Sequence, residues 1–182
     1  QCGERLERLD VDADLLTDVG LEALTRASRL RELALGGAPW LDGSGLRALV
    51  DVGAPLQRFS LRDAPQSTWR TLDAVGSLET VEEVELDDVA LDGDGLGALA
   101  ALPRLRRLTV RGDSVHPGAF DDLAEATLER VNLRVVRGVD DLALQAFAAS
   151  STLRELTLFS VREPTRRGWA ALACAPRLER LS

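Results

Sequence analysis

Two aspartates and three glycines fall within the segment LDGDGLGALA, which runs from residue 91 to residue 100. Carboxylates at this spacing could hold calcium, and the glycines beside them could cradle a phosphate. A calcium loop of the EF-hand type needs further oxygen ligands at fixed positions and a glutamate at its twelfth position. Counted from Asp92, the fifth position is Leu96 and the twelfth is Pro103. The pattern therefore favours a structural turn over a calcium site.

His116 is the only histidine, and Asp113 and Ser114 stand beside it in the segment GDSVHPGAF. A catalytic triad needs three side chains that meet in space from different directions, which three neighbours in one turn rarely achieve. A single histidine also provides no histidine pair for a metal site. We therefore expect His116 to be a loop residue before a helix, and we predict no catalytic residues, no cofactor and no metal ion.

The two cysteines, Cys2 and Cys174, stand near opposite ends of the chain. If the chain forms stacked strands about 4.8 Å apart, as argued below, their separation is roughly 30 Å or more. No disulfide can bridge that distance. We expect small, reduced side chains near helix ends, which fits a cytoplasmic protein, and the alternative is a reactive thiol.

Three tryptophans, Trp40, Trp69 and Trp169, could serve in recognition, because tryptophan is enriched where binding energy concentrates. Trp169 takes a place that leucine holds in the aligned segments of other repeats, which predicts a core position. Trp69 lies in a helical segment and Trp40 in the turn after a strand. We expect packing in the core or on the helical side of the molecule for these residues.

The composition limits the classes of function. The net charge is −8, whereas a nucleic-acid-binding protein usually carries a basic excess. No apolar run approaches the roughly 18 residues of a membrane span, and no signal-peptide pattern is visible at the start. Lysine, isoleucine, methionine and tyrosine are absent, and these residues use AT-rich codons. We expect a GC-rich, bacterial gene and a chain that binds neither nucleic acid nor membrane.

The pattern apolar-x-x-apolar-x-apolar recurs along the whole chain. Its intervals are 24, 26, 25, 24, 23, 25 and 25 residues, a register that chance does not keep. It starts at Leu6, Leu30, Leu56, Val81, Leu105, Leu128, Leu153 and Leu178.

The second half of each unit also recurs, as in TDVGLEALTRAS, DGSGLRALVDVG, DGDGLGALAALP and TRRGWAALACAP. Apolar residues in these segments are spaced as in a helix, whereas those of the first half alternate as in a strand. Asp92 or Asp94, Asp140 and Thr165 are suitable helix N-caps. The segment LDGDGLGALA is therefore the strand-to-helix turn of the fourth unit.

With this spacing, the sequence resembles the leucine-rich repeat proteins over essentially its whole length. Its helix-bearing segments, such as GLGALA and GLEALT, are similar to the ribonuclease-inhibitor-like, cysteine-containing and GALA classes of repeat. The resemblance implies an α/β solenoid of about seven repeats of 23–26 residues, a curved horseshoe segment with parallel strands on the concave side and helices on the convex side. It also implies protein recognition as the usual function.

One feature departs from the family. The position three residues after the last apolar residue of the strand often holds asparagine or cysteine, which pairs with the turn backbone. Here it holds Asp14, Ala38, Ala64, Val89, Asp113, Val136 and Val161. The turn amides must therefore pair with backbone or water.

We expect residues 1–182 to form one leucine-rich repeat domain. The sequence opens on the tail of a helix and closes on a strand at Leu181, with no visible polar cap at either end. Because solenoids shield their terminal faces with caps, we expect flanking repeats, caps or other domains in a longer chain.

The residues that alternate with the buried apolar positions should face solvent on the concave side. The first such column reads Arg, Glu, Arg, Glu, Arg, Arg, Glu along the units, so cross-strand ion pairs are one interpretation. The alternation breaks between units five and six, where Arg107, Arg111, Arg130 and Arg134 form a four-arginine cluster. Arginine binds carboxylates in a two-pronged geometry, so this cluster predicts a docking site for a protein or an acidic peptide. The predicted partner-binding residues are Arg107, Arg111, Arg130, Arg134, Arg58, Arg62, Glu83, Glu85 and Phe159.

The leading hypothesis is a non-catalytic, cytoplasmic protein-interaction module. An enzyme is a second hypothesis, although an open curved sheet offers few pockets for convergent titratable groups. A structural spacer in a larger protein is a third. GALA-type relatives are secreted bacterial effectors that join the host ubiquitin machinery, so a substrate-targeting region is a further alternative, although no F-box segment is visible.

Overall fold

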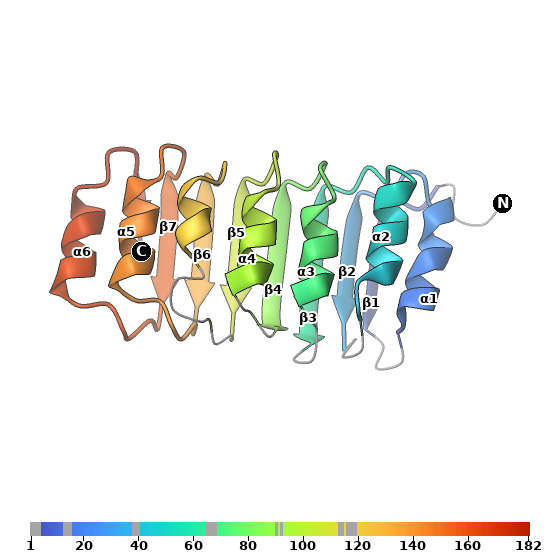
Figure 1. Ribbon diagram of the computed structural model, residues 1–182, viewed down its shortest axis with the longest axis horizontal. Coiled ribbons are helices and arrows are strands. Elements are labelled where there is room, and N and C mark those ends of the chain that lie inside the picture. Colours follow the sequence, from blue (N-terminus) through green and yellow to red (C-terminus); the bar gives the residue numbers. More distant parts are fainter. Residues whose placement is uncertain are drawn as a thin grey trace.

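The computed structural model repeats one unit, a short strand followed by a turn and a helical segment (Figure 1). It describes residues 5–12, 16–37, 41–64, 69–89, 91, 93–112, 115 and 120–182, and of residues 93 and 94 the backbone alone. The strands are β1 (Arg8–Asp12), β2 (Glu32–Gly36), β3 (Arg58–Ala64), β4 (Glu83–Val89), β5 (Arg107–Arg111), β6 (Arg130–Arg134), β7 (Glu155–Phe159) and β8 (Arg180–Leu181). The helices are α1 (Asp18–Glu22), α2 (Ser44–Asp51), α3 (Trp69–Gly76), α4 (Gly93–Ala100), α5 (Asp141–Ala149) and α6 (Arg166–Ala173), with 3-10 helices η1 (Ala23–Arg26) and η2 (Asp121–Ala124).

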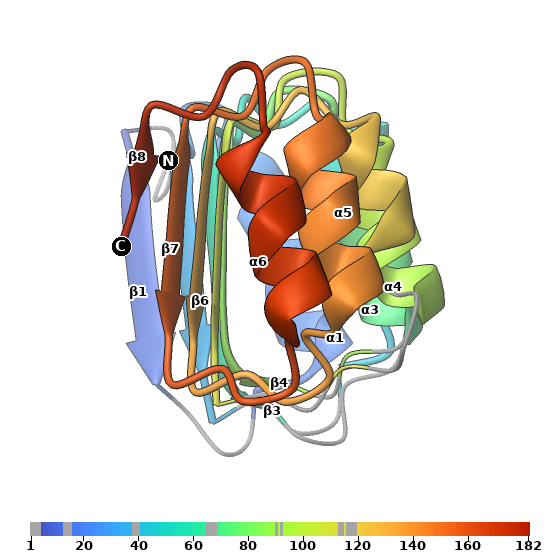
Figure 2. The same cartoon turned by 90° about the vertical axis from the view of Figure 1, so that its left-hand side faces the viewer.

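All eight strands form one parallel sheet in sequence order, from β1 to β8. Equivalent positions of successive repeats lie side by side, so Arg58 pairs with Glu83, Glu83 with Arg107, and Arg107 with Arg130. Figure 2 shows the strands in one layer and the helices in the other. In Figure 1 the row of helices is longer than the row of strands, which places the sheet on the inner, concave side. The predicted α/β leucine-rich repeat solenoid is confirmed.

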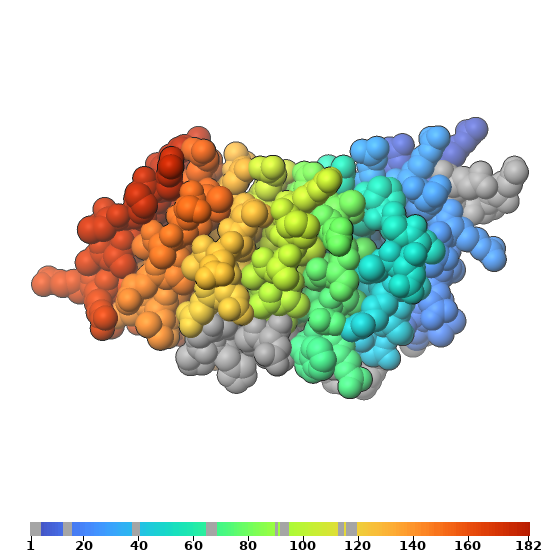
Figure 3. Space-filling view, turned by 45° about the horizontal axis from the view of Figure 1, so that its top comes forward, coloured from blue at the N-terminus to red at the C-terminus, as the bar shows by residue number. Residues whose placement is uncertain are grey.

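The core lies between the two layers and consists of aliphatic side chains. The last apolar residue of the repeated pattern is fully buried from β2 to β6, as at Leu35, Leu61 and Val110. The helices contribute their own buried faces, such as Leu46 and Leu49 in α2. Figure 3 shows successive units in contact along the molecule. Each unit therefore buries its apolar face against its neighbours, as expected for a solenoid.

Tight approach between helices depends on glycine. A Cβ atom on Gly45 of α2 would lie 2.4 Å from the carbonyl oxygen of Asp18. The Asp18 carboxylate accepts hydrogen bonds from the amides of Asp42 and Gly45, at 2.9 and 2.8 Å. The same arrangement recurs at α6, where Asp141 accepts from the amides of Thr165 and Gly168 and from the Thr165 hydroxyl. Carboxylates at helix starts thus bind the next unit in the stack.

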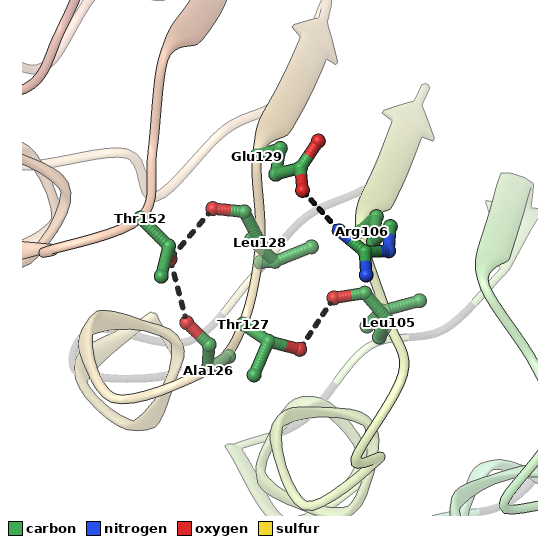
Figure 4. Close-up of polar contacts among 7 residues, drawn as sticks. All are labelled: Leu105, Arg106, Ala126, Thr127, Leu128, Glu129 and Thr152. Carbon is green, nitrogen blue, oxygen red and sulfur yellow. Dashed lines mark hydrogen bonds and ion pairs between the residues drawn. The ribbon is translucent and has the colours of Figure 1, made fainter.

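Threonine hydroxyls link the units on the side where helices lead into strands. Thr127 donates to the carbonyl of Leu105, and Thr152 donates to the carbonyls of Leu128 and Ala126, as Figure 4 shows. Thr80 donates in the same way to Leu56, at 2.7 Å. These hydroxyls satisfy carbonyls that the sheet leaves unpaired, and the sequence analysis did not identify them.

The position that often holds asparagine in this family extends the core instead. Ala64, Val89 and Val136 are buried there. In two repeats the amide one residue earlier pairs with backbone, since Gly112 donates to Arg134 and Val135 donates to Phe159. Of the two predicted partners, backbone or water, these two turn amides use backbone.

The predicted helix N-caps at Asp140 and Thr165 are confirmed, since each side chain accepts a hydrogen bond from a first-turn amide. Asp92 and the Asp94 side chain lie outside the described part of the chain. The core position predicted for Trp169 is wrong, because its side chain is 41% exposed. Trp169 belongs to α6, and no further helix of the described residues packs over it.

Trp69 begins α3 and is 46% exposed, with the Arg70 guanidinium over its ring at 5.7 Å. It therefore lies on the convex side without being part of the core. Trp40 lies outside the described residues. No helix in the described ranges has the length and apolar character to cross a membrane.

Candidate functional site

The concave face of the sheet is the candidate functional surface, because the helices cover only the opposite face. From β1 to β7 each strand presents alternate side chains on this face. We call the side chains of Arg107, Arg111, Arg130 and Arg134, on β5 and β6, the arginine cluster.

The register brings the arginine cluster together as two opposed pairs. Arg107 lies beside Arg130, and Arg111 lies beside Arg134, on neighbouring strands. Like charges placed directly opposite one another in a sheet are destabilising. The side chains must therefore find opposite charges elsewhere or remain available to an external anion.

Three of the four arginines find carboxylates on the outer strands. Arg107 pairs with Glu83 at 3.4 Å, Arg111 pairs with Glu85 at 3.4 Å, and Arg130 pairs with Glu155 at 3.3 Å. These pairs are half exposed, and pairs of this kind contribute only about 0–1 kcal/mol each. These three ion pairs therefore add little to the stability of the fold.

Arg134 differs from the other three. No carboxylate of the described residues lies within ion-pair distance of its guanidinium. Its guanidinium carbon instead lies 5.7 Å from the ring centre of Phe159, which is 58% exposed on β7. Contact with the face of an aromatic ring attracts a cation without neutralising it. Arg134 and Phe159 together present a positive charge beside an exposed apolar surface.

Two buried side-chain atoms of the described residues have no hydrogen-bond partner, the Nε of Arg111 and the Oδ1 of Asn132. Both belong to β5 and β6, where the arginine cluster lies. Buried polar atoms without a hydrogen-bond partner are rare in folded proteins. Their presence here is consistent with a surface whose polar groups serve binding as well as folding.

The charges of the concave face divide along the sheet. Strands β1 to β4 carry six carboxylates and three arginines there, whereas β5 to β8 carry five arginines and one carboxylate. The carboxylates are Asp10, Asp12, Glu32, Glu83, Glu85 and Asp87 in the first half and Glu155 in the second. A partner that covers this face must match an acidic half and a basic half.

The acidic half contains a hollow of about 230 Å³ that spans β1 to β4 over the small side chains of Ala34 and Ser60. Arg58 and Arg62 line it, together with Glu83 and Glu85. Arg58 pairs with Glu32 at 2.6 Å, and Glu32 also pairs with Arg8 at 3.4 Å.

The Arg62 side chain extends across the small β2 residues Ala34 and Gly36 to β1, where its Nη2 lies 2.7 Å from the Oδ1 of Asp10. The predicted binding residues therefore form two groups, the arginine cluster with Phe159 and the rim of this hollow. The sequence analysis did not identify the hollow, although the small residues in consecutive units were a visible signal.

The sequence also singled out the histidine segment and two cysteines. His116, Ser114 and Asp113 lie outside the described residues, as does Cys2. Cys174 is exposed at the end of α6, as expected for a residue near a helix end. Within the described ranges, no group of three acidic, histidine or cysteine side chains could hold a metal ion.

Among the described residues, two carboxyl groups have clearly shifted pKa values, and both lie at the starts of helices. Hydrogen bonds from Ser44 lower the pKa of Asp42. Hydrogen bonds from the hydroxyl and the amide of Thr165, and then from the amide of Gly168, lower the pKa of Asp141. The Asp42 carboxylate thus serves its own turn, whereas the Asp141 carboxylate links its turn to the next unit.

No protein-family model matches the chain. F-box/LRR-repeat protein 12 of Homo sapiens is 34% identical over 101 residues, which is 55% of this chain and 31% of that protein. The chain thus spans about a third of the length of that relative.

Two solved structures resemble the fold. The TLR13–ssRNA13 complex is 12% identical with a TM-score of 0.56, and the match covers 99% of this chain and 33% of that one. An internalin (inlF) from Listeria monocytogenes str. 4b F2365 is 12% identical with a TM-score of 0.46, covering 95% of this chain and 58% of that one. At such identity the TLR13 match shows the fold alone.

Proposed function

We propose that this chain, a leucine-rich repeat protein, is a non-catalytic recognition module that binds a protein partner on its concave face. The arginine cluster and Phe159 form the main contact in this proposal. The observation that carries it is the pairing of Arg107 with Arg130 and Arg111 with Arg134 on adjacent strands. Like charges placed side by side do not stabilise the fold, whereas they provide a binding surface for the carboxylates of an acidic partner.

The partner's chemistry follows from the exposed groups. Guanidinium groups bind carboxylates in a two-pronged geometry, and an exposed aromatic ring gives an apolar anchor. An acidic segment of a protein satisfies both. A nucleic acid is disfavoured by the net charge of −8 and by Glu83, Glu85 and Asp87 on the strand next to the cluster.

The likeness to an F-box/LRR-repeat protein supports a recognition role for repeats of this kind inside a larger protein. A substrate-targeting region, as in a secreted bacterial effector, is the second candidate on that ground. A structural spacer is the remaining alternative, and it requires that charge reversal on the concave face changes no interaction.

Affinity capture from lysate of the cells that express the chain tests the proposal. The test variant carries Arg107→Glu, Arg111→Glu, Arg130→Glu and Arg134→Glu. The control variant has the same net charge, through glutamate in place of four exposed arginines outside the concave strands, Arg26, Arg29, Arg104 and Arg177. Circular dichroism establishes that both variants are folded.

We expect the wild type and the control to capture the same protein and the test variant to lose it. Equal capture by all three forms contradicts the assignment of the site. Capture that disappears after nuclease treatment contradicts a protein partner.

A further inference from the structure

A hollow of about 360 Å³ lies at the edge of the sheet where β6 and β7 end. Its lining includes Val135, Val136 and Arg137 after β6, and Ser160, Arg162 and Glu163 after β7. Arg134 and Phe159 are the last residues of these two strands, so the hollow continues directly from the arginine cluster.

In six of the repeats, the residue two positions after the last apolar residue of the repeated pattern adopts a left-handed backbone conformation. Four of the six are glycine or aspartate, which adopt it more readily than other residues, namely Gly37, Asp63, Asp88 and Gly112, and a fifth is Ser160. The sixth is Val135, with φ of +59°. A β-branched residue in this region is a genuine outlier, because its side chain crowds the backbone.

Val135 does not compensate for this strain by burial, since its side chain is 56% exposed. The turn itself does not require valine, because five equivalent turns form without it. Strained residues that persist without a structural reason cluster at binding and active sites.

Val135 and Phe159 are neighbours in this arrangement. The Val135 amide donates to the carbonyl of Phe159 at 2.7 Å, so the two exposed apolar side chains extend from adjoining backbone. Phe159 is 58% exposed. Val135 lines the hollow and Phe159 directly precedes the lining residue Ser160, so both provide exposed apolar surface at this edge of the sheet.

The surroundings of this apolar surface are basic. Arg134, Arg137 and Arg162 are exposed, and no ion pair joins any of them to a carboxylate of the described residues. Among the described residues that line the hollow, Glu163 is the single carboxylate. The region therefore complements a segment that is apolar at its centre and acidic at its flanks.

We infer that the hollow, with Val135 and Phe159, is an anchor site for a partner segment that carries one large apolar side chain flanked by aspartate or glutamate. The inference rests on the proposed function and extends it, because it names the partner's chemistry and adds Val135, Arg137 and Arg162. The apolar side chain enters the hollow against Val135 and Phe159. The flanking carboxylates pair with the three arginines.

Selection of a random-sequence peptide library against the whole chain tests the anchor site. We expect enriched peptides with leucine, isoleucine, phenylalanine or tryptophan next to acidic residues. Their affinity should fall about tenfold or more for Phe159→Ala and for Val135→Asn. Asparagine tolerates the left-handed conformation, so Val135→Asn should also raise the melting temperature.

Asp63→Asn is the matched control, because Asp63 holds the equivalent left-handed position in the repeat of β3 and lies outside the lining of the hollow. It should leave peptide affinity unchanged. Enrichment of peptides without acidic residues overturns the inference. So does an absence of enriched peptides, and so does equal affinity for the wild type and Val135→Asn.

Failure of the anchor site and failure of the proposed function give different results. If Val135→Asn and Phe159→Ala bind peptides like the wild type while the four-arginine variant loses them, the arginine cluster binds and the anchor inference fails. If no variant changes peptide binding, both fail. If a single-stranded poly(U) probe binds the wild type and this binding is lost in Phe159→Ala, the inference of a peptide ligand is overturned. Base stacking on Phe159 is then indicated.

Discussion

Arg134 lies with its guanidinium carbon 5.7 Å from the centre of the Phe159 ring on the neighbouring strand. Arg107, Arg111 and Arg130 each form an ion pair with a carboxylate. Arg134 forms no ion pair with a carboxylate of the described residues. The aromatic ring holds the Arg134 side chain in place and leaves its hydrogen-bonding edge free. Arg134 is thus the member of the arginine cluster most available to a partner.

The first prediction concerns Arg134→Glu. Because this change breaks no ion pair, we expect the free energy of unfolding to change by less than about 0.5 kcal/mol. Affinity for an acidic partner should fall about tenfold or more, since attraction becomes repulsion. Urea denaturation and a binding titration measure the two quantities. A large loss of stability with unchanged affinity would assign Arg134 a structural role.

The second prediction concerns Val135→Asn. Removal of the left-handed strain of a β-branched residue should stabilise the fold by about 1 kcal/mol, because the exposed valine side chain contributes little burial. The midpoint of urea denaturation should rise accordingly. A lower midpoint would show that the Val135 side chain packs in a way that its exposure does not reveal.

The third prediction compares two glycine-to-alanine changes in helices. Gly45→Ala should destabilise the fold by about 1–3 kcal/mol, because the new methyl group would lie 2.4 Å from the Asp18 carbonyl oxygen. Gly97→Ala meets only the mobile carboxylate end of Asp122, at 2.7 Å. It should therefore be neutral or stabilise by up to about 1 kcal/mol through helix propensity. Similar losses at both positions would refute the close helix approach at Gly45.

The fourth prediction concerns pH and Asp141. Hydrogen bonds from Thr165 hold the pKa of Asp141 below its ordinary value in the folded chain. A lowered folded pKa gives stability that is complete above the unfolded pKa of about 4 and is lost as pH falls through the folded pKa. Asp141→Asn should therefore melt at a lower temperature than the wild type at pH 7, and the difference should shrink below pH 4.

Asp51→Asn is a suitable control for that series, because Asp51 is exposed at the end of α2. Its melting temperature should not fall below that of the wild type at pH 7. A difference between Asp141→Asn and the wild type that persists unchanged to the lowest pH would exclude the ionised carboxylate as its cause.

The repeated architecture could be predicted because its signals are local and recur in every unit. The apolar spacing located all eight strands, and the register followed because equivalent residues of a solenoid lie side by side. Asp140 and Thr165 were identifiable as N-caps because that role depends only on residue type and position. The repeat register likewise predicted that Arg107 lies beside Arg130, and the structure shows this pairing.

Other features depend on neighbours that one repeat does not reveal. Trp169 occupies a core position in the pattern, yet the exposure of α6 leaves it uncovered. The hollow beside Val135 arises from backbone geometry at the ends of β6 and β7, and residue types alone do not report a left-handed φ at valine. The threonine links were a missed signal, because Thr80, Thr127 and Thr152 all directly precede the repeated pattern.

The most direct test of the central claim is the dissociation constant of the captured partner for three folded forms of the chain. They are the wild type, the variant with all four cluster arginines changed to glutamate, and the control with Arg26, Arg29, Arg104 and Arg177 changed to glutamate. The account predicts a loss of about 100-fold or more for the cluster variant and a change of less than about threefold for the control. Equal losses for both variants would mean that net charge governs binding, which would contradict recognition by the arginine cluster.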